Sequence, residues 1–276
     1  MRECVERISN TSLSEDDRIT AFDELELLVE SLDNANDLRP LGLWAPIIGM
    51  LSSELSSMRM YAAWVLGTAV QNNPQAQKDF LDAGGLEPVL GVLENDSDSE
   101  VRTKAFYCVS SAIRHNTTLF KAFHAANGFR VVVSALQNAD PALLRRTVFF
   151  WKTLLETDAS NGGVLDADAA DADAVRTIAD LAAAAMSEHG VATMVMHLGE
   201  AVDLDLTEKC IELLDTFARR FPTAIDADTL SAISSSFVPK VEARLDAMHK
   251  ADAEDVGEAK AMLARLSEAV AAAKSS

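Results

Sequence analysis

The sequence predicts an all-α chain of stacked helical repeats, because it has an internal period of 43 residues and a composition that favours helix. One block recurs as GLWAPIIGML at 42–51, GLEPVLGVL at 85–93 and GFRVVVSAL at 128–136. A second block follows each of these and starts at Met58, Val101 and Leu144, in steps of 43 residues. A fixed period near this length is typical of armadillo and HEAT repeats, which bury their apolar faces only by stacking. The predicted fold is therefore an armadillo-type α-α superhelix, a right-handed solenoid of four repeats with helical caps at both ends.

Composition supports helix throughout. The 276 residues are 49% hydrophobic and only 6% aromatic, and windows rich in Ala and Leu are good helix formers. We expect one domain, 1–276, made of N-terminal cap helices (1–41), repeats one to three (42–157), an acidic insertion (158–176), repeat four (177–225) and C-terminal cap helices (226–276).

The N-terminal cap is predicted from local signals. Ser12 and Glu15 have the spacing of a capping box, and the helix that follows places apolar residues on one stripe. That stripe consists of Ile19, Phe22, Leu25, Leu28, Val29 and Leu32. The segment Asp33-Asn34-Ala35-Asn36-Asp37 is rich in turn formers, so we expect the helix to stop there.

Each repeat then contains a long inner helix, predicted at 59–72, 101–115, 143–156 and 206–221. Asn73-Pro74 and Phe221-Pro222 should end the first and the fourth, because the residue before Pro avoids the helical region. Asp140-Pro141 should open the third. Gly84-Gly85 and Asn127-Gly128 should end the short helices, where a left-handed residue is needed.

The fourth repeat follows the third at a larger interval. Leu206 matches Leu144 but lies 62 residues later, so 19 extra residues fall near Asp158 to Thr177. We interpret this segment, which contains DADAADADA, as a surface insertion. It lacks an EF-hand pattern, because positions 6 and 12 counted from Asp166 are Asp171 and Thr177 rather than Gly and Glu. Two acidic, Ala-rich helices should close the C-terminal end.

Charge restricts the possible partners. A net charge of -19 argues against nucleic acid and against anionic membranes. Residues 59–152 nevertheless hold 10 Lys and Arg against 8 Asp and Glu. This reflects either drift in surface composition or a cationic strip on the inner face for a partner with surface carboxylates. The charged N-terminus and the unpaired Cys4, Cys108 and Cys210 favour a reducing, cytoplasmic location.

Catalytic and metal-binding motifs are missing from the sequence. It contains no GxGxxG, GxxxxGK[ST], HExxH or GxSxG, and its five histidines are scattered. We therefore expect a binding protein that is not an enzyme, has no cofactor and acts as a monomer.

The inner helices carry aromatic residues in a row. Peptide-binding armadillo proteins pair a Trp with an Asn four residues later, and the Asn holds the peptide backbone. The matching pairs here are Trp64/Thr68, Tyr107/Ser111 and Phe150/Leu154, so the amide row is missing. The rings either pack between repeats or, with Arg and Lys nearby, form a docking surface.

Several segments resemble one family. LVESLDNANDL (28–38), GLW (42–44), MRMYAAWVLGTAVQNNP (58–74) and LRRTVFFWKTLL (144–155) look like the cytosolic armadillo-type nucleotide exchange factors of heat-shock-70 chaperones. The resemblance covers about residues 10–225 and fades across the insertion and in the C-terminal helices.

The resemblance implies a function. Members of this family are not enzymes; their concave face embraces one lobe of the chaperone's nucleotide-binding domain and displaces or distorts the other, so that ADP leaves, ATP enters and client protein is released. Members also tend to carry a flexible N-terminal segment that assists client release. This chain begins some 30 residues before the DNAND segment. We therefore expect the flexible N-terminal segment to be absent.

The resemblance also implies a binding surface. Its predicted members are Asn34, Ala35 and Asn36 at the N-terminal edge, Arg145 and Arg146 on the third inner helix, and Trp64, Arg102, Lys104, Tyr107 and Arg114 between them. Asn34 alternatively only stabilises a helix end, and one of the two adjacent arginines should point away from the groove. The alternative function is a generic armadillo adaptor that binds a peptide or helix of another protein.

Overall fold

The computed structural model describes residues 1–136, 141–158, 160, 163, 177–191, 203–247 and 253–274. Its regular elements are helices, as predicted. The chain divides into two compact units, Met1–Ala139 and Asp140–Ser276. The boundary falls inside the third predicted repeat, and the prediction of a single domain stays a prediction.

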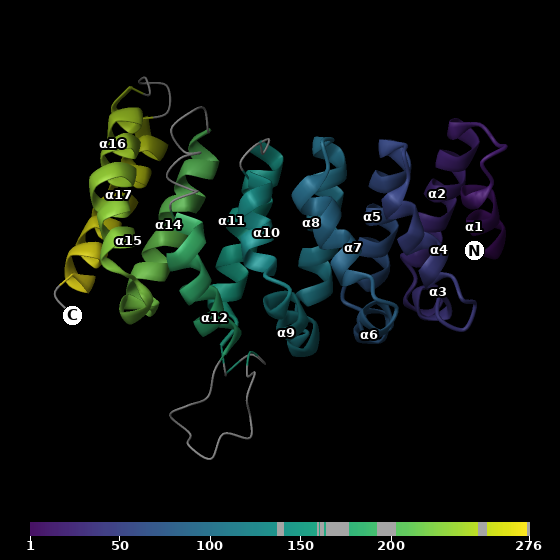
Figure 1. Ribbon diagram of the computed structural model, residues 1–276. Coiled ribbons are helices and arrows are strands. Elements are labelled where there is room, and N and C mark those ends of the chain that lie inside the picture. The colour runs from purple at the N-terminus through teal and green to yellow at the C-terminus, as the bar shows by residue number, and fades with distance from the viewer. Residues whose placement is uncertain are drawn as a thin grey trace, which may run out of the picture. The chain divides into compact units, whose positions relative to one another are not determined.

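In the first unit, long helices alternate with short ones. The long helices α2, α5 and α8 lie side by side, with α5 in contact with both neighbours (Figure 1). The helices are α1 (Arg2–Ser9), α2 (Glu15–Val29), α3 (Leu32–Asp37), α4 (Trp44–Gly49), η1 (Met50–Ser52), α5 (Ser56–Val70), α6 (Pro74–Asp82), α7 (Leu86–Asn95), α8 (Ser99–Ile113), α9 (Thr117–Ala125) and α10 (Gly128–Ala135).

The 43-residue period reappears in the helix boundaries. Helices α5 and α8 begin 43 residues apart, and so do α6 and α9. The predicted inner helices are confirmed, although each starts two or three residues earlier than expected. Phe22 of α2, Met58 of α5 and Phe80 of α6 are fully buried in the core between these layers, where each such side chain contributes about 1.5–3 kcal/mol.

Two asparagines one repeat apart begin the short helices. The side-chain oxygens of Asn73 and Asn116 accept hydrogen bonds from the backbone N–H groups of Ala76 (3.2 Å) and Leu119 (2.9 Å). The Asn-Pro pair at 73–74 was expected to end the preceding helix, but α5 already ends at Val70. This pair instead starts α6, because an N-cap Asn followed by Pro suits a helix start.

The turns after α6 and α9 contain left-handed residues, as predicted. Gly84 has φ +70° and Asn127 has φ +55°, and both end a short helix. Gly85 serves a different purpose, because a Cβ added there would lie 2.2 Å from the ring of Phe80. The close approach of that ring, rather than its φ angle, therefore requires glycine at position 85.

The start of α2 differs from the prediction. Its N-cap is Ser14, whose hydroxyl oxygen accepts a hydrogen bond of 3.2 Å from the backbone N–H of Asp17. The capping box predicted at Ser12 and Glu15 is wrong, and the true cap lies two residues later. Both positions offer Ser followed by an acidic residue three places on, so the sequence alone did not separate them.

The DNAND segment also differs from the prediction, because all five of its residues lie inside helix α3 rather than in a turn. The backbone N–H of Ala35 donates to the Ser31 carbonyl at 2.9 Å, and the Ala35 side chain is buried. Burial of this alanine and of Leu38 outweighs the weak helix propensity of Asn and Asp.

The apolar stripe of α2 is only partly buried. Phe22, Leu25 and Val29 are in the core, but Leu28 is 37% exposed and Leu32 is 55% exposed. Helix α2 ends at Val29 instead of continuing to residue 32, so Leu32 leaves the stripe. The buried face of the last turn includes Glu26 instead.

The second unit contains the remaining helices of the described residues. They are α11 (Pro141–Glu156), α12 (Ile178–Ala185), the π-helix η5 (Met186–Gly190), α14 (Leu204–Arg220), η6 (Pro222–Ala224), α15 (Ala227–Ala232), the π-helix η7 (Ile233–Phe237), α16 (Val238–Ala247) and α17 (Ala253–Ala273). The predicted cap of α11 at Asp140 and most of the fourth-repeat block at 190–198 lie outside the described residues.

The predicted insertion, 158–176, also lies outside the described residues, except for Asp158, Ser160 and Gly163. Its two ends are held together. The backbone N–H of Ala179 donates to the Thr157 carbonyl at 3.1 Å, and that of Ile178 donates to the Gly163 carbonyl at 2.8 Å. The chain therefore leaves and re-enters the unit at one place.

Candidate partner-binding surface

Rings from α2 and α5 form a stacked column that ends beneath a lysine of α8. Phe22 stacks on Tyr61, and Tyr61 stacks on Trp64, with 5.7 Å between ring centroids in both pairs. The Lys104 ammonium lies 3.5 Å from the centroid of the Trp64 ring. A cation–π contact of this kind is worth about 0.5–2 kcal/mol. The structure thus brings Trp64 and Lys104, both partly exposed, together on the long helices.

Tyr107 lies one turn further along α8 and packs on α5. A Cβ added at Gly67 would lie 2.6 Å from its ring, so glycine permits this close approach. The Tyr107 hydroxyl donates to the side-chain oxygen of Gln71 at 3.2 Å. Burial raises the pKa of Tyr107, and the negative charge of Glu26 adds to the rise. The hydroxyl therefore keeps its proton at neutral pH.

A cavity of about 330 Å³ opens beside Tyr107 in the first unit. It is lined by Glu26, Val29, Glu30, Leu32, Thr68, Gln71 and Tyr107. Glu26 is only 8% exposed and accepts a hydrogen bond of 2.8 Å from the Thr68 hydroxyl. Sequence reasoning missed this carboxylate, although an acidic residue on the apolar face of a predicted helix was a visible signal.

The third ring of the predicted aromatic row lies elsewhere. Phe150 is 5% exposed and packs edge-on against Trp151 at 6.0 Å, whereas Phe149 is 60% exposed. Phe150 lies 43 residues after Tyr107, as the repeat requires, but adjacent residues in a helix point about 100° apart, and in α11 the neighbouring Phe149 is the exposed ring. Phe149 is the exposed aromatic of α11.

Arg102 is one of the arginines that recur once per repeat. Arg59 and Arg102 are 43 residues apart, and each donates through Nη1 to a carbonyl six residues before it, at 2.8 Å. Arg102 is only 8% exposed. We expected its guanidinium group on the partner-binding surface, but the structure places it against the start of its own helix.

The Arg59 guanidinium group also forms a bidentate pair with Asp96. The Nε–Oδ2 and Nη2–Oδ1 distances are 2.5 and 3.0 Å, and both side chains are largely buried. Burial by itself would raise the pKa of Asp96. The hydrogen bonds from Arg59 and from the Asp98 backbone reverse this effect, so the pKa lies below its ordinary value.

Arg145 occupies the next equivalent position, in the second unit. It forms ion pairs with Asp203 and, at 2.8 Å, with Asp205 at the start of α14. Arg146 is exposed and has no ion pair with a described residue. The adjacent arginines thus have different surroundings: Arg145 joins two helices and Arg146 is exposed, while the prediction that one of them points away from the groove stays a prediction.

The predicted N-terminal edge consists of three residues with different surroundings. The Asn34 amide donates to the Leu28 carbonyl at 2.8 Å, so it joins α3 to the end of α2. Ala35 is buried, and its side chain is not available to a partner in this conformation. The side-chain oxygen of Asn36 is buried without a hydrogen-bond partner among the described residues. Arg114, just after α8, is exposed.

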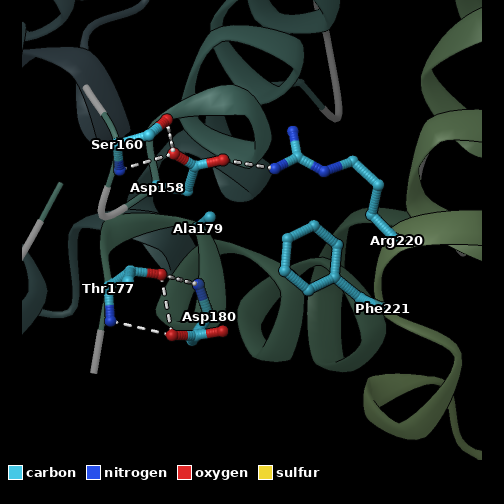
Figure 2. Close-up of a pocket in the computed structure, with 7 residues that line it drawn as sticks. All are labelled: Asp158, Ser160, Thr177, Ala179, Asp180, Arg220 and Phe221. Carbon is cyan, nitrogen blue, oxygen red and sulfur yellow. Dashed lines mark hydrogen bonds and ion pairs between the residues drawn. The ribbon is translucent and has the colours of Figure 1, made fainter. Parts of the chain in front are cut away.

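A second cavity, in the second unit, lies where the predicted insertion begins and ends (Figure 2). The Arg220 guanidinium group donates to Asp158 at 2.7 Å, and the other Asp158 oxygen accepts from Ser160. Thr177 and Asp180 form a reciprocal capping box at the start of α12. The polar groups in the figure form hydrogen bonds with one another. They therefore hold the local backbone in place rather than presenting a reactive group to the cavity.

The cysteines behave as small apolar residues. Cys4, Cys108 and Cys210 are all buried and unpaired. Burial raises the pKa of Cys108 far above the ordinary thiol value and that of Cys210 to about 12. Across the described residues, no group of three or more His, Cys, Asp and Glu is arranged to hold a metal ion. None of the described helices has the length and apolar character that a bilayer crossing requires.

Comparison with known families decides the relationship. A family model described as the SIL1/FES1/HPBP1 C-terminal domain matches residues 34–271. The chain belongs to this family. A second model, nucleotide exchange factor Fes1, matches residues 1–38. The SIL1/FES1/HPBP1 match ends within α17, so it reaches further than the expected limit near residue 225.

Curated relatives carry the same family name. "Hsp70 nucleotide exchange factor FES1" of Eremothecium gossypii is 44% identical over 108 residues, which are 38% of this chain and 37% of that protein. The Schizosaccharomyces pombe protein of that name is 41% identical over 104 residues, 38% of this chain and 36% of its own. The Coccidioides immitis protein of that name is 42% identical over 105 residues, which are 38% of this chain and 50% of that protein. The match thus spans a third to a half of each relative.

Solved structures support the fold. A designed armadillo repeat protein in complex with the peptide (KR)4 superposes with a TM-score of 0.63 at 14% identity, over 97% of this chain and 98% of that one. A computationally designed armadillo repeat protein for modular peptide recognition superposes with a TM-score of 0.63 at 14% identity, over 95% of this chain and 98% of that one. The predicted armadillo-type, all-α fold is confirmed.

Proposed function

We propose that this chain is a nucleotide exchange factor that binds the nucleotide-binding domain of a heat-shock-70 chaperone and promotes release of ADP. The observation that carries this proposal is the family match over residues 34–271, together with the names of the relatives. ATP then rebinds and client protein is released. The chain would act as a non-catalytic monomer in the cytoplasm, without a cofactor.

The surface that we propose for the chaperone lies on the long inner helices, which line the concave face in this fold. In the first unit it comprises Trp64, Lys104 and Tyr107, with Asn34 and Asn36 at the edge and Arg114 at the end of α8. In the second unit it comprises Arg146 and Phe149. Aromatic and arginine side chains are frequent binding anchors, which supports the choice. Ala35, Arg102 and Arg145 would act indirectly, by holding the helices in place.

Exchange by such a surface requires only differential affinity. A factor that binds the open nucleotide-binding domain more tightly than the closed, ADP-loaded one lowers the affinity for ADP by the same ratio. No catalytic group is needed for this mechanism. The strong negative charge of the chain also gives no reason to expect nucleic acid or anionic membrane as partners.

The amide positions of peptide-binding armadillo proteins argue against an extended peptide as the ligand. The equivalents in the first unit are Thr68 and Ser111, which are both buried. The Thr68 hydroxyl donates to Glu26, and neither residue has an amide that can donate to and accept from a peptide backbone.

The test is release of a fluorescent ADP analogue from a purified heat-shock-70 chaperone. Sub-stoichiometric amounts of the chain should accelerate release, and Trp64→Ala should reduce the acceleration because it removes the ring beneath Lys104. Glu87→Gln, on the exposed side of α7, is the control and should match the unaltered chain. Absence of acceleration at micromolar concentration would refute the proposal.

A further inference from the structure

The cavity beside Tyr107 contains a buried carboxylate that has no cation. Glu26 is 8% exposed, and its carboxylate receives one hydrogen bond, from Thr68. No Lys, Arg or His of the described residues forms an ion pair with it. Burying a carboxylate costs free energy unless it is paired and hydrogen-bonded. An uncompensated charge at this depth therefore indicates a cation supplied from outside the chain.

The rest of the lining fits the same ligand. The hydroxyl hydrogens of Thr68 and Tyr107, which both line the cavity, are used by Glu26 and Gln71, so neither hydroxyl has a hydrogen left to donate to a ligand. Glu30 is exposed at the rim and adds a second carboxylate. Acceptors concentrated in one place favour a multivalent donor such as an ammonium or a guanidinium group.

The apolar part of the lining fits an aliphatic stem. Val29 and Leu32 line the cavity, and Leu32 is 55% exposed although it is apolar. Leu27, at 67%, and Leu28, at 37%, are further exposed apolar side chains near the end of α2. Lysine and arginine bury their methylene stems on apolar surfaces while their charged ends reach polar groups. The volume of about 330 Å³ suits one such side chain.

We infer that the cavity formed by Glu26, Glu30, Leu32, Thr68, Gln71 and Tyr107 is the receptor for a lysine or arginine side chain of the partner protein. This inference rests on the proposed function for the identity of the partner, the chaperone, but not for the chemistry of the cavity. The basic side chain would anchor the partner at the α2–α5–α8 end of the surface, beside the Trp64–Lys104 pair. It would complete the charge balance of Glu26 only in the complex.

The decisive variant is Glu26→Gln. The glutamine oxygen still accepts the hydrogen bond from Thr68, and the shape of the cavity is kept, but the charge is lost. We expect binding to the chaperone to weaken at least tenfold, as when one partner of a buried charge pair is removed. The melting temperature of the free chain should stay the same or rise, because the variant removes an uncompensated buried charge. A merely structural Glu26 would show the opposite pattern, a lower melting temperature.

Two further variants complete the binding experiment. Glu30→Gln, at the rim, should weaken binding by a smaller factor, about two- to fivefold, because exposed charges contribute less. Glu87→Gln removes the same charge from the outer helix α7 and should leave affinity unchanged. The inference is overturned if Glu26→Gln binds within twofold of the unaltered chain, or if its melting temperature falls together with its affinity.

A second arm uses the chain without any partner. The chain has two tyrosines, and only Tyr107 lines the cavity, whereas Tyr61 lies between Phe22 and Trp64. With ¹³C-labelled tyrosine, titration with N-acetyl-arginine amide should shift the Tyr107 ring signals saturably, leave Tyr61 in place and have no effect in Glu26→Gln. Sodium chloride at equal ionic strength is the control. A Tyr107 signal that does not move, or that moves equally in the variant, overturns the inference.

The two arms separate the two proposals. If the unaltered chain fails to accelerate nucleotide release, the proposed function fails, and the tyrosine titration still decides on the cavity. If release is accelerated and Glu26→Gln is as active as the unaltered chain, the cavity proposal fails alone.

Discussion

The packing of α8 on α5 depends on Gly67, and replacing it with alanine tests this contact quantitatively. The added Cβ would lie 2.6 Å from the Tyr107 ring and 3.1 Å from the Cα of Cys108. The ring can turn outward, but the Cα of Cys108 belongs to the backbone of α8 and moves only with the helix. Overpacking of this kind costs about 1–3 kcal/mol, against a gain of about 1 kcal/mol for alanine over glycine within a helix. We expect Gly67→Ala to lower the free energy of unfolding by up to about 2 kcal/mol.

Gly91→Ala is the matched control. Gly91 lies within α7, and a Cβ added there would meet nothing within 4 Å. This variant should gain about 0.5–1 kcal/mol from helix propensity and reduced flexibility of the unfolded chain. Urea unfolding followed by circular dichroism should therefore separate the two variants by about 1–3 kcal/mol, which is the strain alone, because both variants share the propensity gain. Equal stabilisation of both would refute the argument that Tyr107 and Cys108 require glycine at position 67.

Three further predictions concern the ion pairs and the insertion. Arg59→Met should destabilise the chain by about 3 kcal/mol at neutral pH, because it leaves the buried Asp96 carboxylate without its cation. The pKa of Asp96 is lowered in the folded state, so this loss of stability should shrink as the pH falls below about 4. Unfolding measured across an acid titration checks this. Arg146→Ala should weaken chaperone binding and leave stability unchanged. Arg145→Ala should lower stability only slightly, by about 0–1 kcal/mol, because the ion pairs of Arg145 are partly exposed. Equal chaperone binding by both variants would contradict the assignment of Arg146 to the binding surface. Deletion of 164–171, which keeps the hydrogen-bonded ends of the predicted insertion, should leave nucleotide release intact, and loss of activity would show that the insertion takes part.

The sequence predicted the repeat architecture well because the same period appears in the apolar blocks, in the long helices and in the turns between helices. The long helices recur with the apolar blocks, and the left-handed Gly84 and Asn127 lie where the turn signals predicted them. Local polar signals were less reliable. DNAND has the composition of a turn, but burial of Ala35 and Leu38 makes it helical. Tertiary burial outweighs propensity wherever a short segment closes a core.

The candidate surface was harder to predict, because it depends on which side of a helix a residue faces. Phe149 and Phe150 have the same side chain, and only a rotation of about 100° separates the exposed ring from the buried one. Glu26 was missed for a related reason. The predicted stripe ran through Leu28 and Leu32, but the buried face of α2 runs through Phe22, Glu26 and Val29, and Leu32 lies beyond the end of the helix.

The arginines show how periodicity should be interpreted in a chain of this kind. Arg59, Arg102 and Arg145 recur at 43-residue intervals, and each holds its helix to neighbouring backbone or to an aspartate. Arg59 and Arg102 donate to a carbonyl six residues before each of them, and Arg145 pairs with aspartates at the start of the next long helix, so all three arginines hold helices in place. A partner without that period contacts each repeat differently. Glu26 and Arg146, which have no counterpart one repeat away, are therefore better candidates for recognition than these three arginines.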